Sequence, residues 1–353
     1  MQDTLQITIN KTPQSRVQNL DYHDIQFARE YSDHMLVADF KGGEWQSPEI
    51  MPYGNLSLSP ANPAIHYGQS IFEGLKAYKH SDGKISIFRP KANYDRMNVS
   101  AKRMVMPHIP EEIFMDGLIE LLRLDHKWVP DVEGTSLYIR PFLFATDEFI
   151  GVRPSQDYKF MIITTPVGAY YSKPVKVKVE THYTRAVKGG TGYAKTAGNY
   201  AASLYPAMLA QKEGYDQLIW TDGQNHELIE ESGTMNIMFI LNDALVTAPT
   251  GDTILDGITR DSVLTLAKDW GMKVEERPLS VTEMVQGLES GALKEAFGVG
   301  TAATIAPIEV IANDGIDYKL DESDREFSQR LLKSLTDIRL GRAEDKFGWN
   351  YYI

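Results

Sequence analysis

The chain contains no cysteine among its 353 residues. This absence excludes disulfide bonds, thiolate metal sites and a cysteine nucleophile. The sequence also lacks the run of about 18 apolar residues that a membrane span needs, and its opening residues, MQDTLQITINKTPQSR, have no apolar signal core. We therefore expect a cytoplasmic protein with no membrane partner, whose chemistry rests on other side chains.

Acidic residues outnumber basic ones: the chain has 48 Asp and Glu and 36 Lys and Arg, which gives a net charge of -12. Nucleic-acid binding needs a basic face, and no dense Lys/Arg cluster occurs, so we expect no nucleic-acid partner. An anionic ligand must be bound locally by a few cations and backbone N–H groups. The eight histidines are scattered without an HExxH motif, which makes a metal hydrolase the weaker alternative, and we expect no metal.

The length exceeds that at which single hydrophobic cores usually stop growing, which favours two domains. We predict a small α/β domain over residues 1–168, a linker over 169–175 and a large, strand-rich domain over 176–353. In the small domain, helix patterns cover 94–107 and 112–129, and strand patterns cover 85–90, 135–147 and 159–168.

The large domain combines helix patterns with paired strands. Helices are predicted over 199–214 and 258–271, with Pro206 in the first turns of its helix or bending it. Strands over 234–241 and 244–249 read as a hairpin joined at Asn-Asp, and the stretch 295–311 reads as two strands around a glycine-rich bend.

One lysine, Lys195, stands in GGTGYAKTAGNY among small and aromatic residues. A lysine amine attacks carbonyls only when it is partly deprotonated, which burial can arrange. Such an amine can hold an aldehyde cofactor as a Schiff base. An exposed lysine in an ordinary loop explains the same stretch.

Two adjacent acids, Glu230 and Glu231, precede a tight turn in ELIEESGTMN. Acids at the start of a hairpin are usually solvated, and that interpretation suits Glu230. A carboxylate at the mouth of a strand can also pair with a protonated pyridine nitrogen, the partner that makes pyridoxal phosphate an electron sink.

The stretch LDGITRDSV places Thr259 as the N-cap of a helix, with Gly257 allowing close backbone approach. This is either a plain capped helix or a phosphate site built on free N–H groups. The stretch FGVGTAATIAP lacks both GxGxxG and GxxxxGK[ST], so nucleotide binding is poorly supported.

Seven motifs in order resemble the branched-chain amino acid aminotransferases, pyridoxal-phosphate enzymes of fold type IV. They are HYGQSIFEGLKAY, FRPKANYDRM, LYIRPFL, AKTAGNYAAS, ESGTMN, DGITR and FGVGTAA, within a likeness that runs from about Tyr31 to about Arg342. The resemblance implies a two-domain α/β (α+β) fold, with a smaller N-terminal α/β domain and a larger pseudo-barrel domain that anchors the cofactor. It also implies transamination of L-leucine, L-isoleucine and L-valine with 2-oxoglutarate.

The resemblance assigns cofactor roles to single residues. Lys195 would carry pyridoxal 5'-phosphate as the internal aldimine and then move the proton between the substrate Cα and the cofactor C4′. Glu231 would keep the pyridine nitrogen protonated, or Glu230 if the register is off by one. The remaining expected cofactor ligands are Arg96, Ile258, Thr259 and Thr301 at the phosphate and Tyr200 at the phenolic oxygen.

The resemblance assigns substrate roles as well. Arg140 with Tyr138 would face the distal carboxylate of glutamate without disturbing an aliphatic side chain. The other expected substrate residues are Thr234, Thr301 and Ala302 at the α-carboxylate, Tyr31, Phe72, Tyr138 and Tyr200 around an apolar slot, and Tyr67 and Val152 reaching the neighbouring subunit. A homodimer is therefore implied.

Three alternatives remain open at this point. D-amino acid aminotransferases and aminodeoxychorismate lyase have the same fold, although FEGLKAY, LYIRP and GNYAAS fit the branched-chain type better. A non-catalytic scaffold with a merely structural Lys195 is the third.

Overall fold

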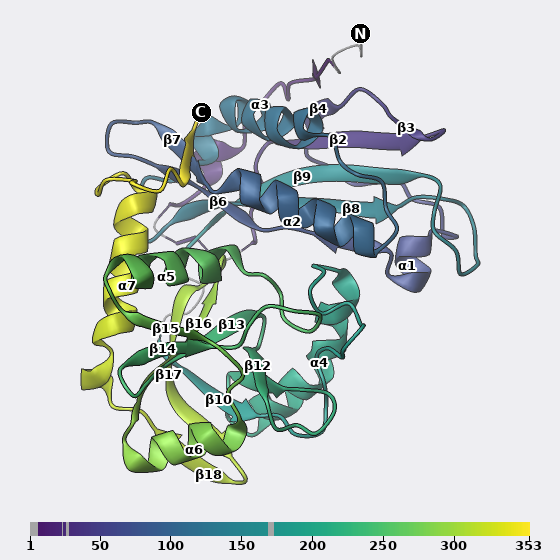
Figure 1. The fold of residues 1–353 in the computed structure, drawn as a ribbon. Helices are drawn as coiled ribbons and strands as arrows, with labels where there is room; N and C mark the ends of the chain where they lie inside the picture. The colour runs from purple at the N-terminus through teal and green to yellow at the C-terminus, as the bar shows by residue number, and fades with distance from the viewer. Residues whose placement is uncertain (1–5, 23, 26–27, 169–172) are drawn as a thin grey trace. The chain divides into compact units, whose positions relative to one another are not determined.

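The computed structural model describes residues 6–22, 24–25, 28–168 and 173–353. The chain divides into two compact units (Figure 1). The first unit comprises Met1–Tyr170, Ala194–Ala197 and Asp337–Ile353, and the second comprises Tyr171–Tyr193 and Gly198–Thr336.

The sequence-based boundaries differ from this division, because they place the two short segments of the first unit in the large domain. Residues 194–197 join the first unit through a bridge between Thr196 and Ile71, and the C-terminal strand pairs with a strand of that unit. Such long-range pairings leave no local sequence signal. Of the predicted linker over 169–175, residues 169–172 lie outside the described residues.

The first unit is built on one ten-stranded sheet. Its central strands are β9 (Tyr158–Val167) and β8 (Ser136–Ala145), which pair antiparallel along their full length. The sheet order is β1 (Thr8–Ile9), β4 (Glu49–Pro52), β2 (His34–Lys41), β9, β8, β6 (Leu75–Lys79), β7 (Ile85–Phe88) and β19 (Asn350–Tyr352), with β3 (Glu44–Trp45) on β2 and β5 (Ser70–Phe72) on β8.

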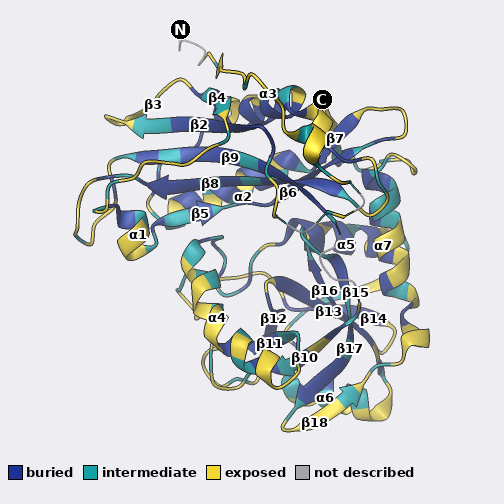
Figure 2. Ribbon diagram, turned by 180° about the vertical axis from the view of Figure 1, so that it is seen from behind, coloured by how far each residue is buried: buried dark blue, intermediate teal, exposed yellow. Residues whose placement is uncertain are grey.

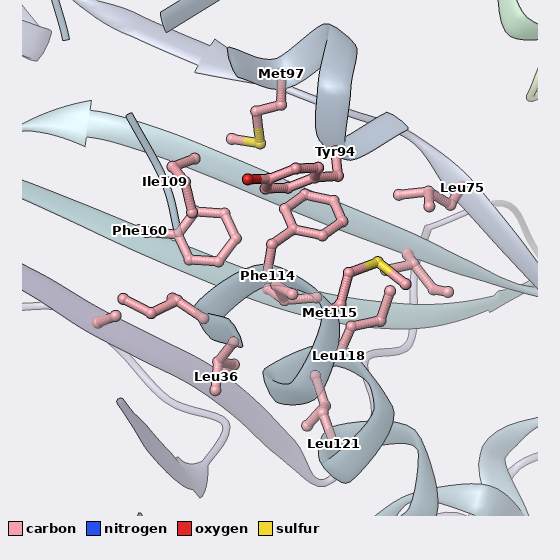
Figure 3. Close-up of a cluster of buried hydrophobic side chains, with 14 of the residues drawn as sticks. Leu36, Leu75, Tyr94, Met97, Ile109, Phe114, Met115, Leu118, Leu121 and Phe160 are labelled. Carbon is pink, nitrogen blue, oxygen red and sulfur yellow. The ribbon is translucent and has the colours of Figure 1, made fainter. Parts of the chain in front are cut away.

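Helices cover one face of this sheet. Met97 of α2 (Pro90–Arg103) and Phe114 pack with Leu36 and Phe160 from the strands in a fully buried core (Figure 3). The helix predicted over 112–129 is instead a π-helical turn (Glu112–Asp116), α3 (Gly117–Leu124) and a 3-10 turn (His126–Trp128). Because strand residues alternate, Leu137 and Ile139 of β8 face this core, and Tyr138 and Arg140 face the other side.

The second unit is built on a nine-stranded sheet that contains a closed barrel. Strand β12 pairs with both β11 and β13, which closes a ring of six strands. The ring runs β12 (Ile229–Ser232), β11 (Gln217–Thr221), β10 (Val175–Val179), β17 (Thr304–Asn313), β16 (Leu293–Gly300) and β13 (Met235–Leu241), with β14 (Ala244–Thr247), β15 (Lys273–Glu276) and β18 (Ile316–Lys319) attached. The pseudo-barrel expected for the large domain is thus present.

The elements around the barrel include the predicted hairpin and both predicted helices. Strands β13 and β14 form the predicted hairpin, and Asn242 and Asp243 turn it with φ of 50° and 58°. Pro206 was predicted to lie in the first turns of its helix or to bend it; it lies in the interior of α4 (Ala197–Lys212), and the bend stays a prediction. The barrel strands are largely buried and much of α4 is exposed (Figure 2). The remaining helices are α1 (Pro63–Tyr67), α5 (Ile258–Asp269), α6 (Val281–Ser290) and α7 (Glu326–Arg339).

Candidate active site

The backbone of Lys195 is fixed by two elements of the first unit. Its N–H donates to Ser100 Oγ on α2 at 2.9 Å, and its carbonyl accepts from the N–H of Phe72 on β5 at 3.0 Å. The next residue, Thr196, donates its hydroxyl to the carbonyl of Ser70 at 3.0 Å. The Lys195 amine lies 4.9 Å from the centroid of the Phe72 ring. The lysine is therefore held in one place beside an aromatic ring.

Arg96 projects from α2 into a buried ion pair that the sequence did not reveal. Its Nε and Nη2 donate to the two carboxylate oxygens of Glu73 at 2.8 and 2.7 Å, and Asn93 Nδ2 donates to the same carboxylate at 2.8 Å. The Glu73 side chain is fully buried and that of Arg96 is 10% exposed. Burial would raise the pKa of Glu73, but the charge and hydrogen bonds of Arg96, together with the Lys195 charge, outweigh it and lower that pKa.

The sheet face away from the core carries Tyr138 and Arg140. Arg140 Nη2 donates to the Tyr138 hydroxyl at 3.1 Å, and its guanidinium lies over the Phe72 ring at 4.6 Å and over the Tyr138 ring at 5.3 Å. Arg140 Nε is buried and has no hydrogen-bond partner within the described chain. A Cβ on Gly74 would lie 2.2 Å from the Tyr138 hydroxyl, so only glycine leaves room for this tyrosine.

Lys76 of β6 pairs in register with Tyr138 and therefore lies on the same sheet face. It is 8% exposed. Burial, with the neighbouring charge of Arg339, lowers the pKa of Lys76 to about 7. The sequence does not distinguish Lys76 from an ordinary exposed lysine, because an alternating strand pattern does not show that its polar face is also buried.

Three predicted substrate residues of the first unit take no part in these contacts. The Tyr31 ring stacks on Tyr53 with centroids 4.9 Å apart. Tyr67, at the end of α1, is 44% exposed, and Val152, in the loop after β8, is 93% exposed. Their predicted roles stay predictions.

In the second unit, Glu231 is the better connected of the two adjacent acids. Its Oε1 accepts from the N–H of Leu255 at 2.9 Å and from Asn236 Nδ2 at 3.3 Å, and its Oε2 lies 3.1 Å from Arg185 Nε. Glu230 is buried as well, and its Oε2 has no hydrogen-bond partner among the described residues. Burial raises the pKa of Glu230, and the nearby Glu231 charge adds to this shift. Arg185 is thus a charged partner of Glu231 that the sequence did not reveal.

The start of α5 is tied to Glu231 through Asn236. Gly257, rather than Thr259, is the N-cap, so the sequence-based cap was wrong by two residues: Ile258 and Thr259 are the first two helical residues. Asn236 Nδ2 donates to the Leu255 carbonyl at 2.9 Å as well as to Glu231. A Cβ on Gly257 would lie 2.0 Å from Asn236 Oδ1. The glycine therefore lets one amide side chain hold the carboxylate and the helix start together.

Two turns of the barrel carry the other predicted site residues. Asn236 of β13 pairs with Val299 of β16 in antiparallel register. Two residues beyond this pair, Thr234 precedes β13, and Thr301 follows β16 with Ala302 next to it. The register therefore directs Thr234 and Thr301 toward the same end of the barrel. Tyr200, in contrast, lies half-buried in the first turn of α4.

Neither a metal site nor a membrane span emerges from the described ranges. Across residues 6–22, 24–25, 28–168 and 173–353, no group of three or more His, Asp or Glu is arranged to hold a metal ion. In the same ranges, no helix is long and apolar enough to cross a membrane.

Comparison with known families then identifies the chain. The sequence model of amino-transferase class IV matches residues 70–311. The chain belongs to the class IV aminotransferases. It is 45% identical to branched-chain-amino-acid aminotransferase 2 of Bacillus subtilis over 350 residues, which are 98% of this chain and 95% of that protein.

Solved structures of class IV aminotransferases share its fold. The branched-chain aminotransferase of Thermoproteus uzoniensis with norvaline has a TM-score of 0.75 and 27% identity, covering 90% of this chain and 99% of that one. The branched-chain amino acid aminotransferase of Escherichia coli has a TM-score of 0.71 and 28% identity, covering 89% and 98%. These matches confirm the aminotransferase family and the two-domain fold type IV that the seven motifs predicted. They do not favour the alternative of a non-catalytic scaffold protein.

A third solved structure contains a cofactor derivative. It is a branched-chain amino acid aminotransferase complexed with N-(5'-phosphopyridoxyl)-L-glutamate, with a TM-score of 0.73 and 25% identity, covering 89% of this chain and 98% of that one.

Proposed function

We propose that this class IV aminotransferase transfers the amino group of L-leucine, L-isoleucine and L-valine to 2-oxoglutarate, giving branched-chain 2-oxo acids and L-glutamate. The observation that carries the proposal is the shared contact with Phe72: the Lys195 amine lies 4.9 Å and the Arg140 guanidinium 4.6 Å from that ring. A reactive amine and a carboxylate-binding cation thus border the same apolar side chain. The names of the relatives support the same substrates.

The residues present fit pyridoxal 5'-phosphate as the cofactor. The Lys195 amine suits its aldehyde, and the Arg96 fork and the N–H groups of Ile258 and Thr259 suit its phosphate. The N-cap of α5 is a glycine without a capping side chain, as expected where a ligand takes the place of a cap. When bound, the cofactor supplies an electron sink for the charge left on the substrate Cα.

The other proposed ligands complete this set. Glu231, 3% exposed and oriented by Asn236 and Leu255, would hold a proton on the pyridine nitrogen. Glu230 lacks these contacts, so we assign the role to Glu231. Tyr200 would donate to the phenolic oxygen, and the hydroxyls of Thr259 and Thr301 would add to the phosphate site.

Lys195 has a second task in the proposed reaction. Its amine would take the proton from the substrate Cα and return it at the cofactor C4′. Two hydrogen bonds fix its backbone, and its four-carbon side chain would carry the amine to both atoms.

Substrate selection is assigned to the cluster around Arg140. Its Nε, which has no partner in the described chain, and its remaining N–H groups would bind the distal carboxylate of glutamate. With an aliphatic substrate, the guanidinium stays packed on Phe72 and Tyr138. We assign the α-carboxylate to Thr234, Thr301 and the N–H of Ala302, and the wall of the slot to Tyr31 and Tyr200 as well.

We also propose that the enzyme is a homodimer. Large apolar side chains on α1 and the loop after β8 are exposed, and the Phe149 N–H of this loop donates to the carbonyl of Ala61, just before α1. The exposed residues are Ile65, Tyr67, Phe149, Ile150 and Val152. Such a cluster is typical of a protein interface, and Tyr67 and Val152 would then reach the site of the partner subunit.

The proposal is tested by single turnover of the purified enzyme loaded with pyridoxal phosphate. L-Leucine, L-isoleucine, L-valine and L-glutamate should each convert the bound cofactor to its pyridoxamine form, and D-alanine should not. Borohydride should fix the cofactor to Lys195 in a peptide map. Conversion by D-alanine but not by L-leucine would favour the D-amino acid enzymes, and a protein that stays colourless with added cofactor would refute the proposal.

A further inference from the structure

We propose that Glu73 is a positioning residue: its buried carboxylate sets the plane of the Arg96 guanidinium so that Arg96 can receive the cofactor phosphate. This inference rests on the proposed function, which assigns the phosphate to Arg96. Neither the motif patterns nor the family match assigns a role to Glu73.

The geometry of the pair defines the orientation. Arginine offers five N–H groups in one rigid plane. Glu73 accepts two of them, from Nε and Nη2, at 2.8 and 2.7 Å. A two-point contact in one plane removes rotation about the Cδ–Nε bond, so the Nη1 edge of the guanidinium points away from Glu73.

Glu73 is itself held on several sides. Asn93 Nδ2 donates to its Oε2 at 2.8 Å and also to the Gly74 carbonyl at 3.2 Å, and the Gly74 N–H lies 3.3 Å from the same carboxylate oxygen. Gly74 in turn contacts the Tyr138 hydroxyl, since a Cβ there would lie 2.2 Å from it. The network therefore links the proposed phosphate ligand to the proposed substrate pocket through rigid, buried groups.

Stability alone is a poor reason for such a pair. Burying a carboxylate and a guanidinium removes both from water, and the penalty often exceeds their mutual attraction. The Glu73 side chain is fully buried, and Lys195 adds a second cation close enough to lower the pKa of Glu73. With Glu73, these three groups carry one net positive charge; without it, they would carry two positive charges and no negative one. The pair thus keeps an anion-binding arginine in place beside the reactive lysine.

The test compares pyridoxal 5'-phosphate with pyridoxal, which lacks the phosphate. Dissociation constants are measured by cofactor absorbance for the wild type, Glu73→Gln, Arg96→Ala and the double variant. Because a hydrogen bond to a charged group contributes about 1.5–3 kcal/mol, Glu73→Gln should weaken binding of pyridoxal phosphate by roughly ten- to a hundredfold. Its affinity for pyridoxal should stay within about threefold of the wild type, which is below the contribution of one such bond.

The double variant shows whether Glu73 acts by orienting Arg96 or by stabilising the fold. If Glu73 acts through Arg96, Glu73→Gln should have little further effect on pyridoxal phosphate binding in the Arg96→Ala background. Asp33→Asn is the matched control, since Asp33 is also a buried carboxylate beside an arginine, Arg16, in the first unit. It should leave the ratio of the two affinities unchanged.

Several results would overturn the inference. Equal weakening of pyridoxal and pyridoxal phosphate binding, or additive losses in the double variant, would make Glu73 merely structural. Should Glu73→Gln fail to fold, Glu73→Asp keeps the charge and loses the two-point geometry, and it must show the same selective loss. A wild type that binds neither compound would refute the proposed function instead.

Discussion

Replacing Lys76 by methionine should stabilise the protein, and more strongly at acidic than at alkaline pH. Lys76 lies on β6 with 8% of its surface exposed, and burial with the nearby Arg339 charge lowers its pKa to about 7. Methionine has a similar unbranched stem without the charge. The substitution therefore removes an ionisable group and keeps most of the packing.

The direction of this pH dependence follows from the number of protons that Lys76 binds in the folded and unfolded states. In the unfolded chain the pKa of Lys76 has its ordinary value of 10.5, so between pH 7 and pH 10.5 the unfolded state holds a proton that the folded state has released. Stability rises with pH across this window, and the full penalty applies below pH 7. A shift of this size is worth about 5 kcal/mol in total, of which about 3 kcal/mol falls between pH 6 and pH 9.

The assay is thermal unfolding of the apoenzyme at several pH values. The gain in Tm of Lys76→Met over the wild type should shrink by about 4 °C from pH 6 to pH 9 for a chain of 353 residues. Lys79→Met is the control on the same strand, because Lys79 reaches solvent and lies 3.3 Å from Asp131. A gain that stays constant or grows with pH would refute the assignment of a buried, easily deprotonated Lys76.

Four further outcomes follow from the site. Lys195→Ala should fold but lose turnover by about a thousandfold or more, and borohydride should leave no label at position 195; substantial residual turnover would contradict its double role. Gly74→Ala should displace the Tyr138 hydroxyl and raise the KM for 2-oxoglutarate about tenfold more than that for L-leucine, measured by steady-state kinetics. Gly257→Ala should disturb Asn236 and weaken pyridoxal phosphate binding in equilibrium dialysis, and unchanged binding would separate α5 from the cofactor site. Ile150→Arg should shift the enzyme from dimer to monomer in analytical ultracentrifugation, whereas an unchanged mass would exclude this loop from the interface.

Local sequence signals predicted the parts of this protein that depend on neighbouring residues. The Asn242–Asp243 hairpin forms because both residues tolerate positive φ, a property of the two side chains themselves. The helix after Gly257 was predicted as well, but its N-cap was not, because capping depends on backbone angles that the residue types alone do not reveal. The helix predicted over 112–129 is divided into three segments for a similar reason: the apolar periodicity does not reveal the hydrogen-bond pattern of each turn.

Motif order was enough to identify the aminotransferase family and to single out Lys195, since seven short patterns in sequence leave little room for coincidence. It favoured Glu231 over Glu230 only through the register of one motif, which a shift of one residue along the strand would reverse. The network of Leu255, Asn236 and Arg185 around Glu231 distinguishes them in space. Motif order could not pair Arg96 with Glu73, which lies 23 residues away in the loop between β5 and β6. Residue type and spacing thus determined which chemistry the chain carries, and only tertiary structure decided which charges are buried together, because burial and ion pairing arise between segments that the sequence keeps apart.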